Sequence, residues 1–128
     1  MAVIQGAGQI VHLKGQVALD EQGRIVGKGD MRAQTRETLT NIQTVPASLG
    51  GRMEDILSRT HHVTDIDAFM TTGDIRRQFF VEPHPVTTTV QVAQLYHLDL
   101  AVEITAIAEI PRDRFRPPPA GFPRRPMP

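Results

Sequence analysis

The side chains that could carry chemistry fall on two segments with strand-like alternation. Thr87, Thr89 and Gln91 share one face of the first segment, because successive side chains of a strand point to opposite faces. Glu103 and Thr105 share a face of the second segment. The hydroxyls could line a ligand cleft, and the carboxylate could hydrogen-bond a water molecule. A simpler interpretation stays open, since threonine is a good strand former and an acid can lie at a subunit edge.

Histidine and cysteine usage argues against a metal centre. Two of the histidines, His61 and His62, are adjacent on an expected strand, so their rings point to opposite faces and cannot chelate one ion. No His-x-His or His-Glu-x-x-His spacing occurs. The chain contains no cysteine, which excludes disulfides and thiolate chemistry. We therefore expect no metal and no other cofactor. The five histidines are His12, His61, His62, His84 and His97.

Length and composition indicate one small domain. A chain of 128 residues with 40% hydrophobic residues can build one core, and a domain of this size gains from oligomerisation. It has no tryptophan and one tyrosine, so the aromatic platforms of single-strand nucleic-acid binders are scarce. No apolar run approaches the roughly 20 residues of a membrane span, and no signal peptide is visible. We expect a cytoplasmic protein with no membrane partner.

The zero net charge hides a contrast between the body and the end of the chain. Residues 111–128 carry five arginines and one acid, and seven of these eighteen residues are proline. Such a tail cannot form a helix or a central strand, so we expect it to be extended or disordered. Residues 1–110 carry nine basic and thirteen acidic side chains. An acidic body argues against binding a phosphate backbone, so nucleic acid is not an expected partner.

The hydrophobic pattern predicts an α+β domain over residues 1–110. Asp30 is a good N-cap for a helix that runs to about Leu49, with Pro46 disturbing its last turn. A second helix is expected over 68–80. Five strands form a mixed sheet with the two helices on one face. The expected strands are 9–19 with an interruption at 14–16, 24–26, 57–64, 87–95 and 100–110.

Five segments in this order resemble the RidA/YjgF family, also described as endoribonuclease L-PSP-like. They include an Ile-Val-His-Leu-Lys-Gly-Gln-Val strand, a Leu-Thr-Asn-Ile helix motif and two strands that resemble the family's signature strands. The resemblance covers about residues 5–110. The segments are 10–17, 34–42, 55–69, 85–92 and 102–108.

The resemblance implies a chorismate-mutase-like fold in a homotrimer. Three chains pack their sheets into a central barrel, with helices outside and ligand clefts between subunits. Members with a particular arginine deaminate imines and enamines. That arginine holds the substrate carboxylate bidentately, and a glutamate activates or positions the attacking water.

The chain departs from the family at the positions that matter most. The arginine position aligns with Thr87, the glutamate position with Thr105, and a cleft asparagine with Gly73. A neutral threonine cannot hold a carboxylate bidentately. The family's serine before a glycine aligns with Lys14, which precedes Gly15.

Lys14 is the candidate that could compensate for the lost arginine. The resemblance places it on the cleft floor, where Gly15 would leave space for a ligand. Lysine would bind a carboxylate as a point charge, or act as an amine nucleophile if desolvated. A solvated lysine at a strand end is the alternative. The candidate catalytic residues are Lys14, Glu103 and Thr105, and the candidate ligand-binding residues are Lys14, Gly15, Gly73, Thr87 and Thr89.

Two functions are therefore expected from the sequence. The first is a deaminase or related hydrolase that acts on a small imine or enamine with non-standard substrate choice, in clefts between the subunits of a homotrimer. The alternative is a trimer that binds a small molecule or a partner without catalysis.

Overall fold

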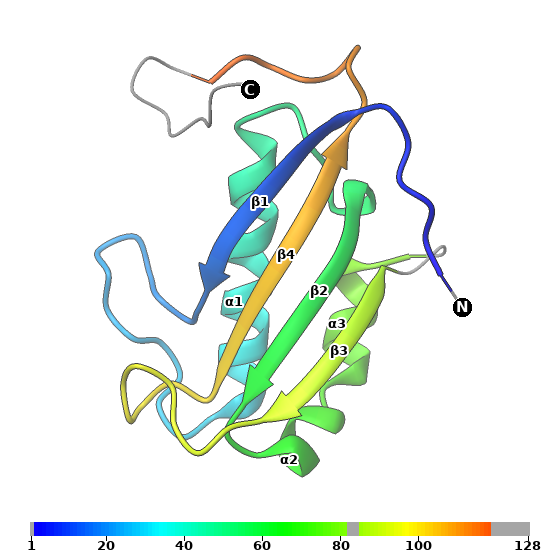
Figure 1. Cartoon of the computed structure of the whole chain (residues 1–128). Coiled ribbons are helices and arrows are strands. Elements are labelled where there is room, and N and C mark those ends of the chain that lie inside the picture. Colours follow the sequence, from blue (N-terminus) through cyan, green and yellow to red (C-terminus); the bar gives the residue numbers. More distant parts are fainter. Residues whose placement is uncertain (1, 82–84, 119–128) are drawn as a thin grey trace.

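The computed structural model describes residues 2–81 and 85–118, which form one sheet covered by helices on one face (Figure 1). The sheet has the strand order β1-β4-β2-β3. β4 pairs antiparallel with both β1 and β2, and β2 pairs parallel with the edge strand β3. The strands are β1 (Gln9–Gln16), β2 (Ile56–Val63), β3 (Val86–Gln91) and β4 (Val102–Ile110).

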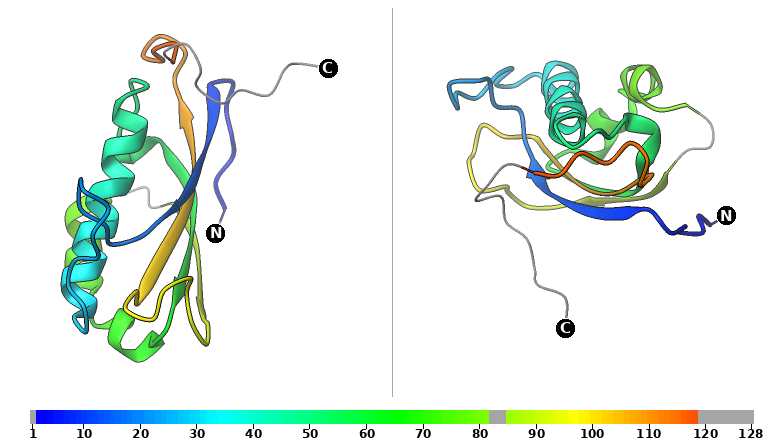
Figure 2. Two further views of the ribbon diagram at one scale, coloured as in Figure 1. Left: turned by 90° about the vertical axis from the view of Figure 1, so that its left-hand side faces the viewer. Right: turned by 90° about the horizontal axis from the view of Figure 1, so that it is seen from above.

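All the helices lie on the same side of this sheet, as the end-on view in Figure 2 shows. They are α1 (Met31–Ala47), the one-turn 3-10 helix η1 (Met53–Asp55), α2 (Ile66–Met70) and α3 (Gly73–Phe79). Asp30 is the N-cap of α1, as predicted, and accepts a hydrogen bond from the Ala33 amide at 3.0 Å. Within the described residues, no helix is long and apolar enough to cross a bilayer.

The core lies between the sheet and the helices because β4 alternates strictly. Its residues Val102, Ile104, Ala106, Ala108 and Ile110 are fully buried, whereas those between them are half-buried. The helices contribute buried side chains that close this layer. Each large apolar side chain stabilises the fold by roughly 1.5–3 kcal/mol when fully buried. The helix-borne core residues are Leu39, Ile42, Phe69 and Ile75.

Among the described residues, no helix lies over the opposite face of the sheet (Figure 2). Val86 and Val90 on β3 are 42% and 39% exposed there, in register with Ser58 and His62 of β2. Exposed valines on an uncovered sheet face fit the expectation of a trimer built sheet to sheet, and that assembly stays a prediction.

The predicted second helix over 68–80 is wrong as a single element. It is divided into α2 and α3, so three α-helices cover the sheet. The Thr71 hydroxyl donates to the Ala68 carbonyl and the Thr72 hydroxyl to the Phe69 carbonyl, at 2.7 and 2.6 Å. These hydroxyls take acceptors that a continuing helix would use for its own amides, and the helix breaks there.

Four boundary predictions also need correction. The first strand, expected over 9–19 with an interruption at 14–16, includes those residues and ends at Gln16. The expected strand 24–26 is reduced to one bridge between Leu19 and Ile25. The strand that begins near residue 87 ends at Gln91 and not at 95, and the last strand begins at Val102. Pro46 lies in the last turn of α1, which ends one residue later at Ala47. A proline that close to the end interrupts little of the helix.

The first residues of the basic tail pack against the domain. Arg114 donates to Asp55 at 2.6 and 3.1 Å and to the Gly50 carbonyl at 2.9 Å. The Arg116 amide donates to the Leu49 carbonyl. Gly50 has a φ of +83°, and a side chain there would collide with the Arg114 carbonyl. The prediction for the rest of the tail concerns 119–128, which lie outside the described residues.

The Gln34 side chain links α1 to the loop before β4 by two hydrogen bonds, and its removal should lower the stability of the fold. The fully buried amide donates to the Asp99 carbonyl and accepts from the Ala101 amide, both at 2.7 Å. Gln34→Ala leaves both backbone groups without these partners, so we expect the free energy of unfolding to fall by about 2–4 kcal/mol. Urea denaturation measures this. The exposed Gln43→Ala on the same helix is the control, and an equal effect of both substitutions would contradict the assignment.

Candidate functional site

Thr87 and Thr89 lie on the helix-covered side of the edge strand. In the parallel pairing of β3 with β2, Thr87 is opposite Arg59 and Thr89 is opposite His61. In-register neighbours point to the same face of a sheet. The Thr89 hydroxyl lies 2.9 Å from His61 Nδ1, which confirms that these side chains share a face. Thr87 is exposed at the outer edge, so its hydroxyl is available to a ligand.

Behind Thr87 lies a buried arginine. Arg59 is 8% exposed, and its guanidinium stacks on the Phe80 ring with the Cζ atom 3.7 Å from the ring centroid. Its Nε and Nη1 atoms have no hydrogen-bond partner among the described residues. Burial, together with the charge of Arg76, lowers the pKa of Arg59 to about 10, so the side chain is still a cation at neutral pH.

A second arginine adds to this cationic cluster. Arg76 of α3 lies over the Phe69 ring at 4.4 Å, and its Nη2 donates to the Phe69 carbonyl at 3.3 Å. Its Nε has no partner among the described residues, and burial lowers its pKa. Gly73 lies beside it, since a Cβ atom at residue 73 would be 3.8 Å from Arg76 Nη2. We call Arg59, Arg76, Thr87 and Thr89 the edge cluster.

His61 is the neutral member of this region. It is 1% exposed and its ring contacts Phe69, with centroids 4.9 Å apart. Burial and the charges of Arg59 and Arg76 lower the pKa of His61 to about 3. The imidazole is therefore uncharged at physiological pH, and it holds the Thr89 hydroxyl without adding to the positive charge.

The buried imidazole predicts a loss of stability in acid. An unfolded chain protonates its histidine near pH 6.5 and the folded chain near pH 3, so the unfolded state binds more protons between these values. The contribution of His61 to the free energy of unfolding should fall by about 1.4 kcal/mol per pH unit as the pH drops through this window. His61→Gln should flatten the slope in urea titrations, whereas the exposed His12→Gln should not. Equal slopes in the wild type and His61→Gln would refute this.

The other candidates lie on the uncovered face of the sheet. Glu103 and Thr105 alternate with the buried residues of β4 and are opposite His62 and Thr60 of β2. Gly15 lies against Glu103, since a Cβ atom at residue 15 would be 3.0 Å from the Glu103 carboxyl carbon. Lys14 is exposed beside them. Within the described residues no ion pair joins Lys14 to Glu103.

One chain does not bring these two sets together. β4 and β3 are separated by β2, so the strands lie about 10 Å apart. The candidate residues also point to opposite faces of the sheet. Lys14, Gly15, Glu103 and Thr105 thus form one group, and Gly73, Thr87 and Thr89 belong with the edge cluster.

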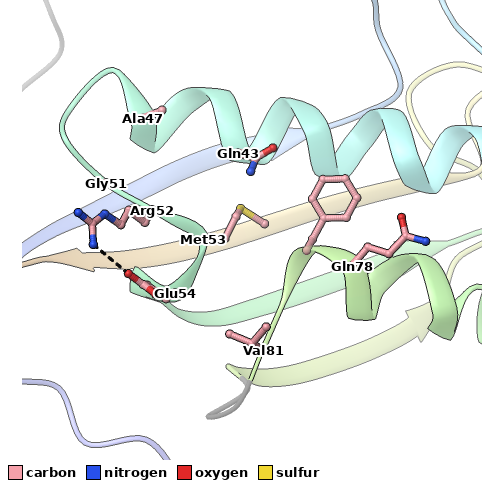
Figure 3. Close-up of a pocket in the computed structure, with 9 residues that line it drawn as sticks. Gln43, Ala47, Gly51, Arg52, Met53, Glu54, Gln78 and Val81 are labelled. Carbon is pink, nitrogen blue, oxygen red and sulfur yellow. Dashed lines mark hydrogen bonds and ion pairs between the residues drawn. The ribbon is translucent and has the colours of Figure 1, made fainter.

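Two pockets of the described chain are lined by neither group. A pocket of about 370 Å³ opens between the end of α1, η1 and the end of α3 (Figure 3). Across its mouth Arg52 is paired with Glu54 at 3.3 Å. Its lining residues are Gln43, Ala47, Gly51, Arg52, Met53, Glu54, Gln78, Phe79 and Val81. Another pocket lies against Arg114 and the start of the tail.

The sequence analysis singled out neither Arg59 nor Arg76 as a ligand-binding residue. A signal for Arg59 was present, because it alternates with His61 and Val63 on one strand and Val63 is fully buried. A charged residue at a core position of a strand is rare unless it has a partner or a ligand. In residues 2–81 and 85–118, no three side chains are placed to hold a metal ion.

The four-stranded mixed sheet with helices on one face defines the class as a small α+β domain with two polar groups on opposite sides of its sheet. The family model described as Endoribonuclease L-PSP matches residues 2–110. The chain therefore belongs to this family, which is also called RidA/YjgF, as its sequence segments predicted.

Individual relatives agree with this membership. A RutC family protein of Pyrococcus horikoshii is 30% identical over 102 residues, which cover 80% of both chains. A 2-iminobutanoate/2-iminopropanoate deaminase of Dermatophagoides farinae is 28% identical over 103 residues, again 80% of both chains. The crystal structure of RidA from an Antarctic Psychrobacter matches with a TM-score of 0.73 and 27% identity, and covers 83% of this chain and 85% of that one.

Proposed function

We propose that this protein hydrolyses small imines or enamines to a carbonyl compound and ammonia, in clefts between the subunits of a homotrimer. The edge strand β3 of one subunit supplies Thr87 and Thr89. The uncovered sheet face of the next subunit supplies Lys14, Glu103 and Thr105. A small-molecule substrate is held between them.

The observation that supports this proposal best is the division of the polar groups. They lie on opposite faces of one sheet, two strand positions apart, and only a neighbouring copy could bring both groups to one ligand. The similarity to a protein named as a 2-iminobutanoate/2-iminopropanoate deaminase supports the choice of reaction.

The hydrolysis needs one carboxylate and one water molecule. Glu103 accepts a proton from water as the water oxygen bonds to the imine carbon, and it returns this proton to the imine nitrogen. The resulting tetrahedral intermediate expels ammonia as its carbonyl group forms, so one water enters and one ammonia leaves. Thr105, on the same face as Glu103, holds the water by its hydroxyl, and Lys14 supplies positive charge beside the intermediate.

A coupled assay tests this function. An amino-acid oxidase makes imines from a panel of amino acids, semicarbazide traps them, and the absorbance of the semicarbazone is followed. An active protein removes the imine first and lowers the rate of semicarbazone formation. Loss of imine at the buffer rate, for charged and neutral imines alike, would reject the proposal. Sedimentation equilibrium tests the trimer, and a monomer would reject the shared cleft.

The substitutions at the family's positions favour a second candidate, a trimer that binds a small molecule without turnover. Thr87 and Thr105 stand where the resemblance implies an arginine and a glutamate. This candidate predicts that a small acid raises the melting temperature, whereas no imine is consumed in the coupled assay.

A further inference from the structure

We propose that Arg59, supported by Arg76, binds the negatively charged group of the ligand, with Thr87 and Thr89 as hydroxyl donors to the same anion. The ligand class is a small carboxylate such as a 2-imino or 2-oxo acid. This assignment rests on the proposed function for the choice of a carboxylate, but it concerns binding and can be tested without turnover.

The first argument is the state of the Arg59 guanidinium. Residue Arg59 is 8% exposed, and its Nε and Nη1 find no acceptor among residues 2–81 and 85–118. Buried arginine in proteins is normally paired, because removing a charge from water without compensation costs several kcal/mol. Stacking on Phe80 orients the guanidinium but gives its N–H groups no acceptor. A bound carboxylate would provide a charged acceptor oxygen for one of these N–H groups.

The second argument is that the side chains around Arg59 include a second positive charge and hydrogen-bond donors. Arg76 lies close enough to lower the pKa of Arg59 by its charge, and its own Nε has no partner among the described residues. His61 is neutral and holds the Thr89 hydroxyl at 2.9 Å. Two like charges placed together in a partly desolvated site repel each other, and an anion between them removes that repulsion.

The third argument is access from the sheet edge. Thr87 is the register partner of Arg59 on the same face and is exposed, so the edge of β3 is the route by which a small anion reaches the buried cation. On the helix side Gly73 lies beside two arginines, since a Cβ atom there would be 3.1 Å from Arg77 Nη1 and 3.8 Å from Arg76 Nη2. Lys14 lies on the other face of the sheet, on β1, and therefore belongs to a different part of the cleft.

The test compares binding of 2-oxobutanoate with binding of its uncharged amide, measured by calorimetry on the full chain. We expect the wild type to prefer the acid and Arg59→Met to bind it at least about 10-fold more weakly, since hydrogen bonds to charged groups contribute about 1.5–3 kcal/mol. Affinity for the amide should change little. Arg59→Lys should keep part of the preference as a point charge. The control is Arg24→Gln at an exposed turn, which should keep the full preference.

Relocating the charge provides a rescue. In the Arg59→Met background, Thr87→Arg places a guanidinium on the neighbouring strand at the same register and should restore the preference for the acid. A folded Arg59→Met protein with wild-type preference would overturn the assignment, as would a wild type without preference. Loss of preference in Lys14→Ala alone would move the anion to the other face. An Arg59-dependent preference without imine hydrolysis would support this inference and reject the proposed function.

Discussion

Arg59→Met is expected to raise the free energy of unfolding by about 2 kcal/mol at pH 7, in a variant that has lost its affinity for carboxylates. Burial is the main cause that lowers the pKa of Arg59 from its ordinary value to about 10. At about 1.4 kcal/mol per pKa unit, keeping the cation in place costs the fold about 3 kcal/mol. Methionine loses the stacking of charge on Phe80, which offsets roughly 1 kcal/mol of that gain.

The measurement is urea unfolding at a fixed protein concentration, because the stability of an oligomer depends on concentration. The exposed Arg24→Gln should stay within about 0.5 kcal/mol of the wild type. A destabilised Arg59→Met would show that the guanidinium serves the fold and would contradict a binding role. A substitution that raises the free energy of unfolding and abolishes binding is typical of a side chain that is needed for function and destabilises the fold.

The pH dependence gives an independent check on the same charge. The pKa of Arg59 is lower in the folded chain, at about 10, than in the unfolded chain, so the unfolded state binds more protons above pH 10. The destabilisation by Arg59 is thus complete below pH 10 and is relieved as the pH rises above it. Arg59→Met should lack this relief, and the stability difference between the two proteins should shrink at high pH.

Glu103→Gln is expected to reduce imine hydrolysis by a factor of about 10² or more, because glutamine keeps the shape but cannot accept the proton of the attacking water. Glu103 is half-buried, lies against Gly15 and shares its face of β4 with Thr105. Glu103→Asp, which keeps a carboxylate on a shorter side chain, should retain more activity than Glu103→Gln. This order separates a proton acceptor from a structural acid.

The coupled imine assay measures this effect, and Glu21→Gln at an exposed turn is the matched control. The three variants Glu103→Gln, Glu103→Asp and Glu21→Gln should have melting temperatures similar to that of the wild type, since Glu103 makes no ion pair among the described residues. Wild-type turnover in Glu103→Gln would contradict the role of Glu103 as the base that accepts a proton from the attacking water. Retained binding of 2-oxobutanoate by that variant is also expected, because the anion lies at the edge cluster and the carboxylate acts at the reacting carbon.

Local pattern was sufficient to predict much of the fold. The alternation in Val102–Ile110 places its buried side chains correctly, because a strand with one covered face must keep a period of two. Asp30 predicts the start of α1 through its cap hydrogen bond. The segments that resemble the RidA/YjgF family predicted the matching family model over 2–110. The break between α2 and α3 was missed, because Thr71 and Thr72 are compatible with a helix until their hydroxyls find the carbonyls of the preceding turn.

By itself, the sequence determined most of the elements, the family and the residues that share a face of one strand, since these follow from spacing along the chain. Tertiary structure alone decided which faces meet. The parallel register of β3 on β2 brings Thr87 beside Arg59 and Thr89 beside His61, across 28 residues of sequence, and no local pattern encodes that pairing. The strand order also separates Lys14 and Glu103 from the threonines, because β2 lies between β3 and the strands β4 and β1. In addition, Lys14 and Glu103 point to the other face of the sheet.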